Sequence, residues 1–120
     1  MDYIKSMDRK QSYLKFLHLA QAVKDTQDFP VLDAVEERVL NIFAVAWHKG
    51  REITVLEAMK MLPDVSESTV FRRIKSLRQK GMVALSMDTK DRRTRYIRPT
   101  ELANDYFGKL GNCMKKAQQV

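Results

Sequence analysis

Hydrophobic residues recur at helical spacing along most of the chain, and the breaks between these stretches mark the ends of the predicted elements. A long helix is predicted over 3–24, a stretch without glycine or proline. Its apolar side chains form two neighbouring stripes, one of Ile4, Met7, Leu14 and Leu17 and one of Tyr13, Phe16, Ala20 and Val23. Two stripes are wider than one small core requires, so one can face the domain and the other a second copy of the chain.

A capping box predicts the start of the next helix. The side chain of Asp33 can accept a hydrogen bond from the first turn, and Glu36, three residues later, can reach back to the cap. An apolar face follows at helical spacing, and Gly50 supplies the glycine that commonly ends a helix. Residues 51–53 then read as a short extended piece.

Two further helices follow, joined by a tight turn. Thr54 and Glu57 form a second capping box that opens a short helix over 55–61. Ser66 can cap a helix over 67–80, whose apolar residues form a single narrow stripe. Two helices joined by a short turn, the second carrying surface bases, are typical of a helix-turn-helix.

A charged hairpin and a last helix complete the pattern. Residues 82–87 and 94–98 are rich in strand formers, whereas 88–93 are too polar for a strand. A hairpin with a charged tip directly after a helix-turn-helix is a wing, so the predicted fold class is α+β, mostly helical. Thr100 can cap the last helix, and its two glycines, each costing about 1 kcal/mol relative to alanine, predict that it kinks or frays beyond Phe107.

The 120 residues suffice for one domain and are too few for two ordinary ones. We predict a single winged-helix domain with its core over 31–99, flanked by dimerisation helices over 1–25 and 100–120. No apolar stretch is long enough to span a membrane, and the first residues lack the apolar core of a signal peptide. A single cysteine, Cys113, fits a reducing compartment, so we expect a cytoplasmic protein.

The excess positive charge lies in one segment of the chain. The formal net charge is +7; residues 66–98 contain ten Lys and Arg against three acids, whereas the remaining residues contain twelve of each. A charge run is often only a solvated surface. A local excess on an otherwise balanced chain instead points to a polyanionic partner. Since the excess coincides with the helix-turn-helix and wing, the predicted partner is double-stranded DNA.

The same segment resembles the recognition helix, wing and following helix of MarR-type transcriptional regulators. The matching residues are Ser68-Thr69-Val70, Arg72, Lys80-Gly81-Met82-Val83, Asp88, Asp91-Arg92-Arg93 and Thr100-Glu101. The departures are Lys90 for a usual Arg, Pro99 for a Leu, Ala103 for a common Gly, and room for only one modest C-terminal helix. The resemblance implies a homodimeric, sequence-specific regulator, most simply a repressor, which binds a near-palindromic operator and can be released by a small-molecule effector.

Ten residues are the predicted DNA contacts: Ser66, Ser68, Thr69, Arg72, Arg73, Lys75, Ser76, Lys90, Arg92 and Arg93. Arg72 is the candidate base reader, because Arg is the commonest bidentate partner of guanine, and Ser66, Thr69 and Lys75 are expected on the backbone. The family pattern suggests that Arg93 pairs with an Asp while Arg92 or Lys90 reaches a minor groove. Phe71 can either close the core or contact a thymine methyl group, and the core is favoured.

The sequence does not predict an enzyme, a metal site or a cofactor. His18 and His48 lack neighbouring ligands at metal-binding spacing, and Trp47 and Tyr96 are expected in the core rather than in a ligand pocket. Cys113 is expected to be inert rather than a redox sensor. The alternative function is a winged-helix protein-interaction or assembly module, in a replication, partition or phage complex, with weak or non-specific DNA binding.

Overall fold

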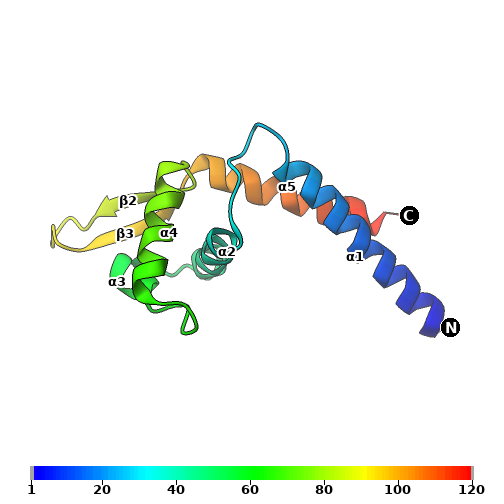
Figure 1. Cartoon of the computed structure of the whole chain (residues 1–120), viewed down its shortest axis with the longest axis horizontal. Coiled ribbons are helices and arrows are strands. Elements are labelled where there is room, and N and C mark those ends of the chain that lie inside the picture. The colour runs from blue at the N-terminus through cyan, green and yellow to red at the C-terminus, as the bar shows by residue number, and fades with distance from the viewer. Residues whose placement is uncertain (1, 120) are drawn as a thin grey trace. The chain divides into compact units, whose positions relative to one another are not determined.

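The computed structural model describes the backbone of residues 2–119 and the side chains of residues 7–119. The chain divides into two compact units, Leu32–Ala103 and a second made of Met1–Val31 with Asn104–Val120. The elements in chain order are α1 (Asp2–Lys24), α2 (Ala34–His48), β1 (Ile53–Thr54), α3 (Val55–Met59), α4 (Glu67–Gln79), β2 (Val83–Met87), β3 (Arg95–Pro99) and α5 (Glu101–Gln118) (Figure 1). The fold is α+β and mostly helical, as predicted.

The wing is a hairpin within a three-stranded antiparallel sheet of order β1-β3-β2. Val83 of β2 lies opposite Pro99 of β3, and Met87 lies opposite Arg95. The other edge of β3 pairs with β1, where Ile53 lies opposite Ile97. The predicted hairpin is thus confirmed to within a residue, and the short extended piece is a third strand that ties the helix-turn-helix to the wing.

The core of the Leu32–Ala103 unit lies between α2, α4 and the sheet. The predicted stripe of α4 is buried as expected, with Val70 and Leu77 fully buried and Ile74 nearly so. From α2, the fully buried ring of Phe43 lies 5.9 Å from the ring of Trp47, whose indole N–H donates to the carbonyl of Ile97 over 3.0 Å. Each fully buried apolar side chain contributes about 1.5–3 kcal/mol, so this core holds α4 and the wing together.

The helix ends follow the capping signals in the sequence. The Asp33–Glu36 capping box is formed, and the Ser66 side chain accepts from the backbone N–H of Thr69. Among the described residues, Gly50 and Gly81 alone have positive φ, at 77° and 80°. Both follow the end of a helix, a position where a left-handed residue is common. Local chemistry therefore sets the boundaries of α2 and α4.

The expectation that the last helix kinks or frays beyond Phe107 was wrong, because α5 is one helix as far as Gln118. Tyr106, Cys113 and Ala117 are buried, which gives its second half an apolar face to bury. The gain from burying that face exceeds the roughly 1 kcal/mol cost of each glycine.

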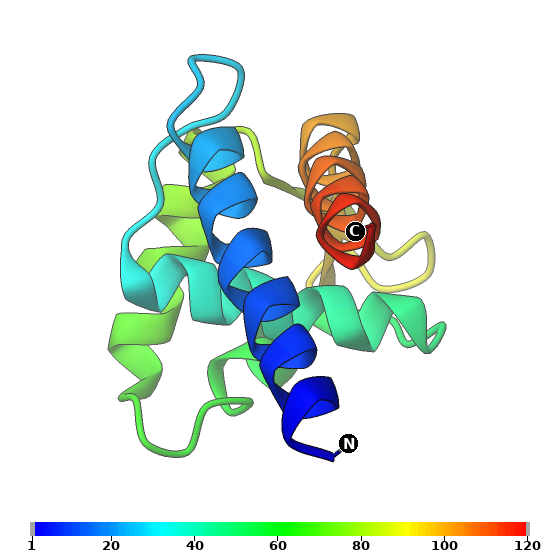
Figure 2. The same ribbon diagram turned by 90° about the vertical axis from the view of Figure 1, so that its right-hand side faces the viewer.

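In the second unit, α1 and α5 lie beside each other (Figure 2). Phe29, in the loop after α1, packs edge-on against Tyr106 with ring centroids 5.2 Å apart, and Lys15 Nζ donates to the carbonyl of Gln119 over 3.2 Å. Ala20 is buried and Phe16, Leu19 and Val23 are half-buried. An apolar row stays exposed on α1, namely Met7, Tyr13, Leu14 and Leu17, and Met114 of α5 is exposed as well. No helix in the described part of the chain is long and apolar enough to cross a membrane.

Candidate nucleic-acid interface

The N-terminal half of α4 presents a polar, cationic surface. Ser66 caps the helix, and its hydroxyl donates to the hydroxyl of Thr69 over 2.7 Å. Thr69 in turn accepts from the Arg72 guanidinium over 3.3 Å. Ser68 and Arg72 are exposed, and the helix N-terminus adds its own partial positive charge. This surface can meet phosphates and base edges together.

Phe71 and Lys75 extend this surface along α4. Phe71 remains 37% exposed, so the interpretation of Phe71 as a core residue was wrong. The Lys75 ammonium lies 5.0 Å from the centroid of its ring, within the range of a cation–π contact. The aromatic ring therefore remains available for an apolar contact, which was the alternative assignment.

Arg73 and Ser76 differ from the other predicted α4 contacts because both engage α2. The Ser76 hydroxyl donates to the Glu36 carboxylate over 2.6 Å. Arg73 Nε lies 3.0 Å from an oxygen of Asp33, an ion-pair contact outside hydrogen-bond alignment. Lys80, the residue that follows the last turn of α4, also pairs with Glu36 over 2.7 Å.

Glu36 was missed as a functional candidate because the capping box alone explained its presence in the sequence. It is 2% exposed. Burial by itself would raise the pKa of its carboxyl group, but the hydrogen bonds from the Asp33 backbone, Lys80 and Ser76 outweigh burial and hold that pKa below its ordinary value. Only the register of α4 against α2, which no local pattern reveals, brings these donors to it.

Two aspartates shape the tip of the wing. Asp88 accepts from the backbone N–H of Lys90 over 2.8 Å and from the Tyr96 hydroxyl over 2.9 Å. These two hydrogen bonds lower the pKa of Asp88, and the bond to Asp88 raises the pKa of Tyr96. Asp91 accepts from the backbone N–H of Arg93 and from the hydroxyl of Thr94, each over 3.0 Å.

Asp91 therefore holds the backbone of Arg93 and not its guanidinium, which differs from the pairing that the family pattern suggested. The side chains of Lys90, Arg92 and Arg93 are all exposed at the tip. Because hydrogen bonds from the backbone to these carboxylates hold the loop, the three cations project from a defined turn and not from a flexible loop.

A hollow of about 580 Å³ lies between α3, α4 and the hairpin. Leu56, 73% exposed, and Phe71 give it an apolar floor together with the half-buried Leu85. Cationic side chains also line it, namely Lys75, Arg78, Arg93 and Arg95. This surface joins α4 to the wing and carries the same charge as both.

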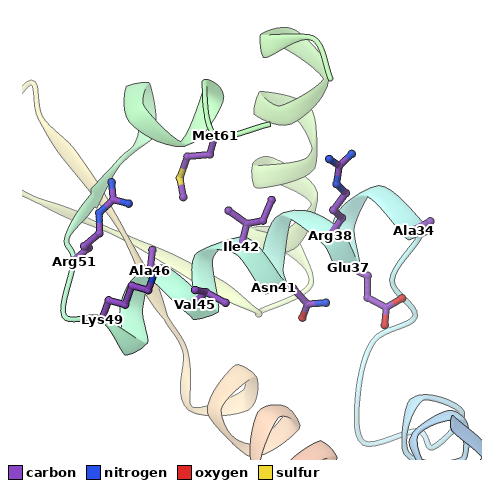
Figure 3. Close-up of a pocket in the computed structure, with 10 residues that line it drawn as sticks. All are labelled: Ala34, Glu37, Arg38, Asn41, Ile42, Val45, Ala46, Lys49, Arg51 and Met61. Atoms are coloured by element: carbon purple, nitrogen blue, oxygen red, sulfur yellow. The ribbon is translucent and has the colours of Figure 1, made fainter. Parts of the chain in front are cut away.

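A second hollow, of about 720 Å³, lies along the outer side of α2 (Figure 3). Ile42, Val45 and Met61 supply apolar groups, and Lys49 and Arg51 lie at one end. Near the other end, Arg38 makes two hydrogen bonds to Asp64, of 2.6 and 2.8 Å. Trp47 and Tyr96 line neither hollow. In the part of the chain that the structure describes, no group of three or more metal-ligating side chains is close enough to hold an ion.

No protein-family model matches the sequence, and no curated protein shows significant sequence similarity to it. Solved structures do share its fold. A transcriptional regulator from Thermotoga maritima superposes with a TM-score of 0.61 at 16% identity, covering 96% of this chain and 72% of that one. The heme sensor PefR from Streptococcus agalactiae, in complex with heme, gives 0.58 at 15%, covering 96% and 72%.

A mutant of MarR from E. coli, complexed with operator DNA, gives a TM-score of 0.51 at 18% identity, covering 98% of this chain and 78% of that one. The chain therefore has the winged-helix fold of MarR-type regulators, as the recognition-helix and wing residues predicted.

Proposed function

We propose that the protein is a sequence-specific, double-stranded DNA-binding transcriptional regulator, most simply a cytoplasmic homodimeric repressor and not an enzyme. The observation that carries this proposal is the exposure of five cations on two adjoining elements: Arg72 and Lys75 on α4, and Lys90, Arg92 and Arg93 on the wing. They belong to the segment that holds the whole excess charge of the chain. Such a patch is the electrostatic footprint expected for a nucleic-acid partner.

In this proposal α4 enters the major groove with its N-terminal half toward the bases. Arg72 reads a guanine, and Ser66, Thr69 and Lys75 contact phosphates. The cations at the wing tip reach the adjacent minor groove, where a narrow A·T-rich stretch concentrates negative potential.

The homodimer is supported by the uncovered apolar row on α1. Tyr13, Leu14 and Leu17 are 60%, 50% and 44% exposed, and a row of this kind is typical of an interface. Light scattering should show a dimer at micromolar concentration. Leu14→Glu with Leu17→Glu should give a monomer, whereas Ala22→Glu, on an exposed position of the same helix, should not. A wild-type monomer would refute the dimer.

DNA selection tests the proposed function directly. The purified protein is used to select genomic fragments near physiological salt, in parallel with Arg72→Ala and with Lys60→Ala, which removes an exposed cation just after α3. The proposal predicts an enriched near-palindrome that Lys60→Ala retains and Arg72→Ala loses. Equal recovery of all fragments by the wild type would refute sequence-specific binding.

We also propose that a small-molecule effector releases the DNA. Two proteins of this fold were solved with, or studied for regulation by, such molecules: PefR with heme, and BpsR from Bordetella bronchiseptica with 6-hydroxynicotinic acid. The hollow along α2 has the size and the mixture of apolar and charged groups of a ligand site. An effector that binds there should release the operator duplex from the wild type and not from Val45→Glu.

A second candidate function is a protein-interaction module with weak DNA binding. The specific observation that favours it is the exposed pair Leu56 and Phe71, since apolar side chains on a charged surface often mark a protein contact. Equal affinity for the selected and for scrambled duplexes would support this candidate over the regulator.

A further inference from the structure

The two residues of the capping box at the start of α2 also bind α4. One oxygen of Asp33 accepts from the Glu36 backbone N–H over 2.7 Å, and the other lies 3.0 Å from Arg73 Nε. One oxygen of Glu36 accepts from the Asp33 backbone N–H over 2.9 Å and from Lys80 Nζ over 2.7 Å. Its other oxygen accepts from the Ser76 hydroxyl over 2.6 Å. We call these five residues the α2–α4 clasp.

The clasp uses a face of α4 different from the one presented to solvent. At about 100° per residue, the clasp residues 73, 76 and 80 centre on a direction roughly a quarter turn from that of the exposed residues 68, 72 and 75, although Ser76 lies only one helical turn beyond Arg72. The buried stripe through Val70, Ile74 and Leu77 occupies the remaining side. The rotation of α4 about its own axis is thus fixed by the apolar stripe and by the clasp together.

Apolar packing and a buried carboxylate differ in how sharply they fix that rotation. Apolar contacts tolerate small slides and rotations, because they have no direction. Glu36 is 2% exposed, and two of its three donors, Ser76 and Lys80, come from α4, so a shift of α4 would take two partners away from a buried charge. That penalty is steep and directional.

We propose that Asp33 and Glu36 are positioning residues for DNA recognition, which set the rotation and height of α4 and so the placement of Ser68 and Arg72. Arg73 and Ser76 then act through the clasp, and not as DNA contacts in their own right. This inference rests on the proposed function, because it assigns how the recognition surface is oriented.

The direction in which one substitution changes DNA affinity separates a positioning role from long-range electrostatics. Glu36→Gln removes a negative charge near a DNA-binding surface, which by charge alone tightens binding. Loss of positioning weakens it. Glu57→Gln is the matched control, because Glu57 is also the third residue of a capped helix, but it is exposed and its partners Thr54 and Arg51 lie outside α4. We expect Glu36→Gln to weaken binding to the selected operator about tenfold and Glu57→Gln to leave it equal or slightly tighter.

The salt dependence of binding separates a clasp residue from a phosphate contact, and the ratio of specific to scrambled affinity is the readout that a merely stabilising role would not move. Each phosphate contact contributes about −0.9 to the slope of log affinity against log salt. Ser76→Ala and Lys80→Met should weaken specific binding, while the slope and the affinity for scrambled duplex stay at the wild-type values. A slope less steep by about 0.9 in Lys80→Met would make Lys80 a phosphate contact and overturn its assignment to the clasp.

Binding is measured at a temperature where circular dichroism shows that each variant is fully folded. If Glu36→Gln does not fold, Ser76→Ala takes its place, because that variant leaves Glu36 its other two hydrogen-bond donors. Amide hydrogen exchange of Arg72 and Lys75, whose N–H groups lie inside the hydrogen-bonded turns of α4, is the second measurement and is made without DNA. It should accelerate in the clasp variants relative to Glu57→Gln. If exchange and specific affinity match the control, the clasp proposal is refuted. If the wild type selects no sequence, the proposed function fails, and exchange alone decides whether the clasp holds α4.

Discussion

Removing the three cations at the tip of the wing should flatten the salt dependence of DNA binding without altering the fold. Lys90, Arg92 and Arg93 are exposed, and the loop that carries them is held by Asp88 and Asp91. The atoms that these carboxylates bind at positions 90 and 93 are backbone N–H groups, which substitution by glutamine retains. The triple glutamine variant therefore removes charge at the tip and leaves the turn in place.

The size of the effect follows from the number of exposed cations. Each cation that neutralises a phosphate contributes about 0.9 to the salt slope, so the slope should fall by up to about 2.7 per protomer. Between about 50 and about 200 mM salt, a difference of that size means that the wild type loses about 40-fold more affinity per protomer than the variant, and roughly 2,000-fold when both protomers of the proposed dimer contact the operator. Fluorescence anisotropy of the labelled operator duplex across this range measures both slopes.

The matched control removes three exposed cations from the part of the chain with no net charge: Arg9→Gln, Lys60→Gln and Lys109→Gln. Its salt slope should equal that of the wild type. A wing variant whose slope stays within about 0.5 of the wild-type slope would refute DNA contact by the wing.

Four further predictions concern stability and are checked by denaturant unfolding. Ser66→Ala removes the cap of α4 and should lower the free energy of unfolding by about 1 kcal/mol, whereas Ser68→Ala, at the second residue of the helix, should not lower it. Phe43→Ala empties the centre of the core and should cost about 3–5 kcal/mol; a loss below about 1 kcal/mol would mean that the site collapses. Gly108→Ala should stabilise by about 0.5–1 kcal/mol, since a Cβ there meets nothing within 4 Å, and a loss would mean that this face is covered by a second copy. Because the pKa of Glu36 is lowered in the folded state, its stabilisation should be present above its unfolded pKa of about 4.3 and disappear as pH falls through the folded value. Glu36→Gln should abolish that part of the acid dependence, and an unchanged pH profile would contradict it.

Local chemistry made most of the fold predictable. Three helix starts can be read from side chains that cap helices, those of Asp33, Thr54 and Ser66. Two helix ends coincide with glycines that adopt positive φ, Gly50 and Gly81. The period of the apolar residues then gives the buried stripe of α4. Such signals lie within a few residues of the element that they define, which is why sequence reasoning recovers them.

What the sequence could not give depends on how distant elements pack. Phe71 and Ile74 look equally apolar in sequence, and only the packing of α4 leaves the first 37% exposed and the second buried. Glu36 satisfied a local rule, so nothing in its neighbourhood pointed to Ser76 and Lys80 some forty residues later. The continuity of α5 likewise depends on burial of Cys113 and Ala117, which outweighs a helix propensity read residue by residue.

In the regulator proposed above, the wing also shows how a new target sequence can be acquired. Its turn contains no glycine and, among the described residues, no positive φ; its shape is encoded by the carboxylates of Asp88 and Asp91. Positions 89, 90, 92 and 93 are exposed and contribute only backbone groups to that shape. In the proposed function, mutations at these positions would change the groups that the wing presents to DNA at little cost in stability, because the two aspartates keep the loop in shape whichever side chains it carries.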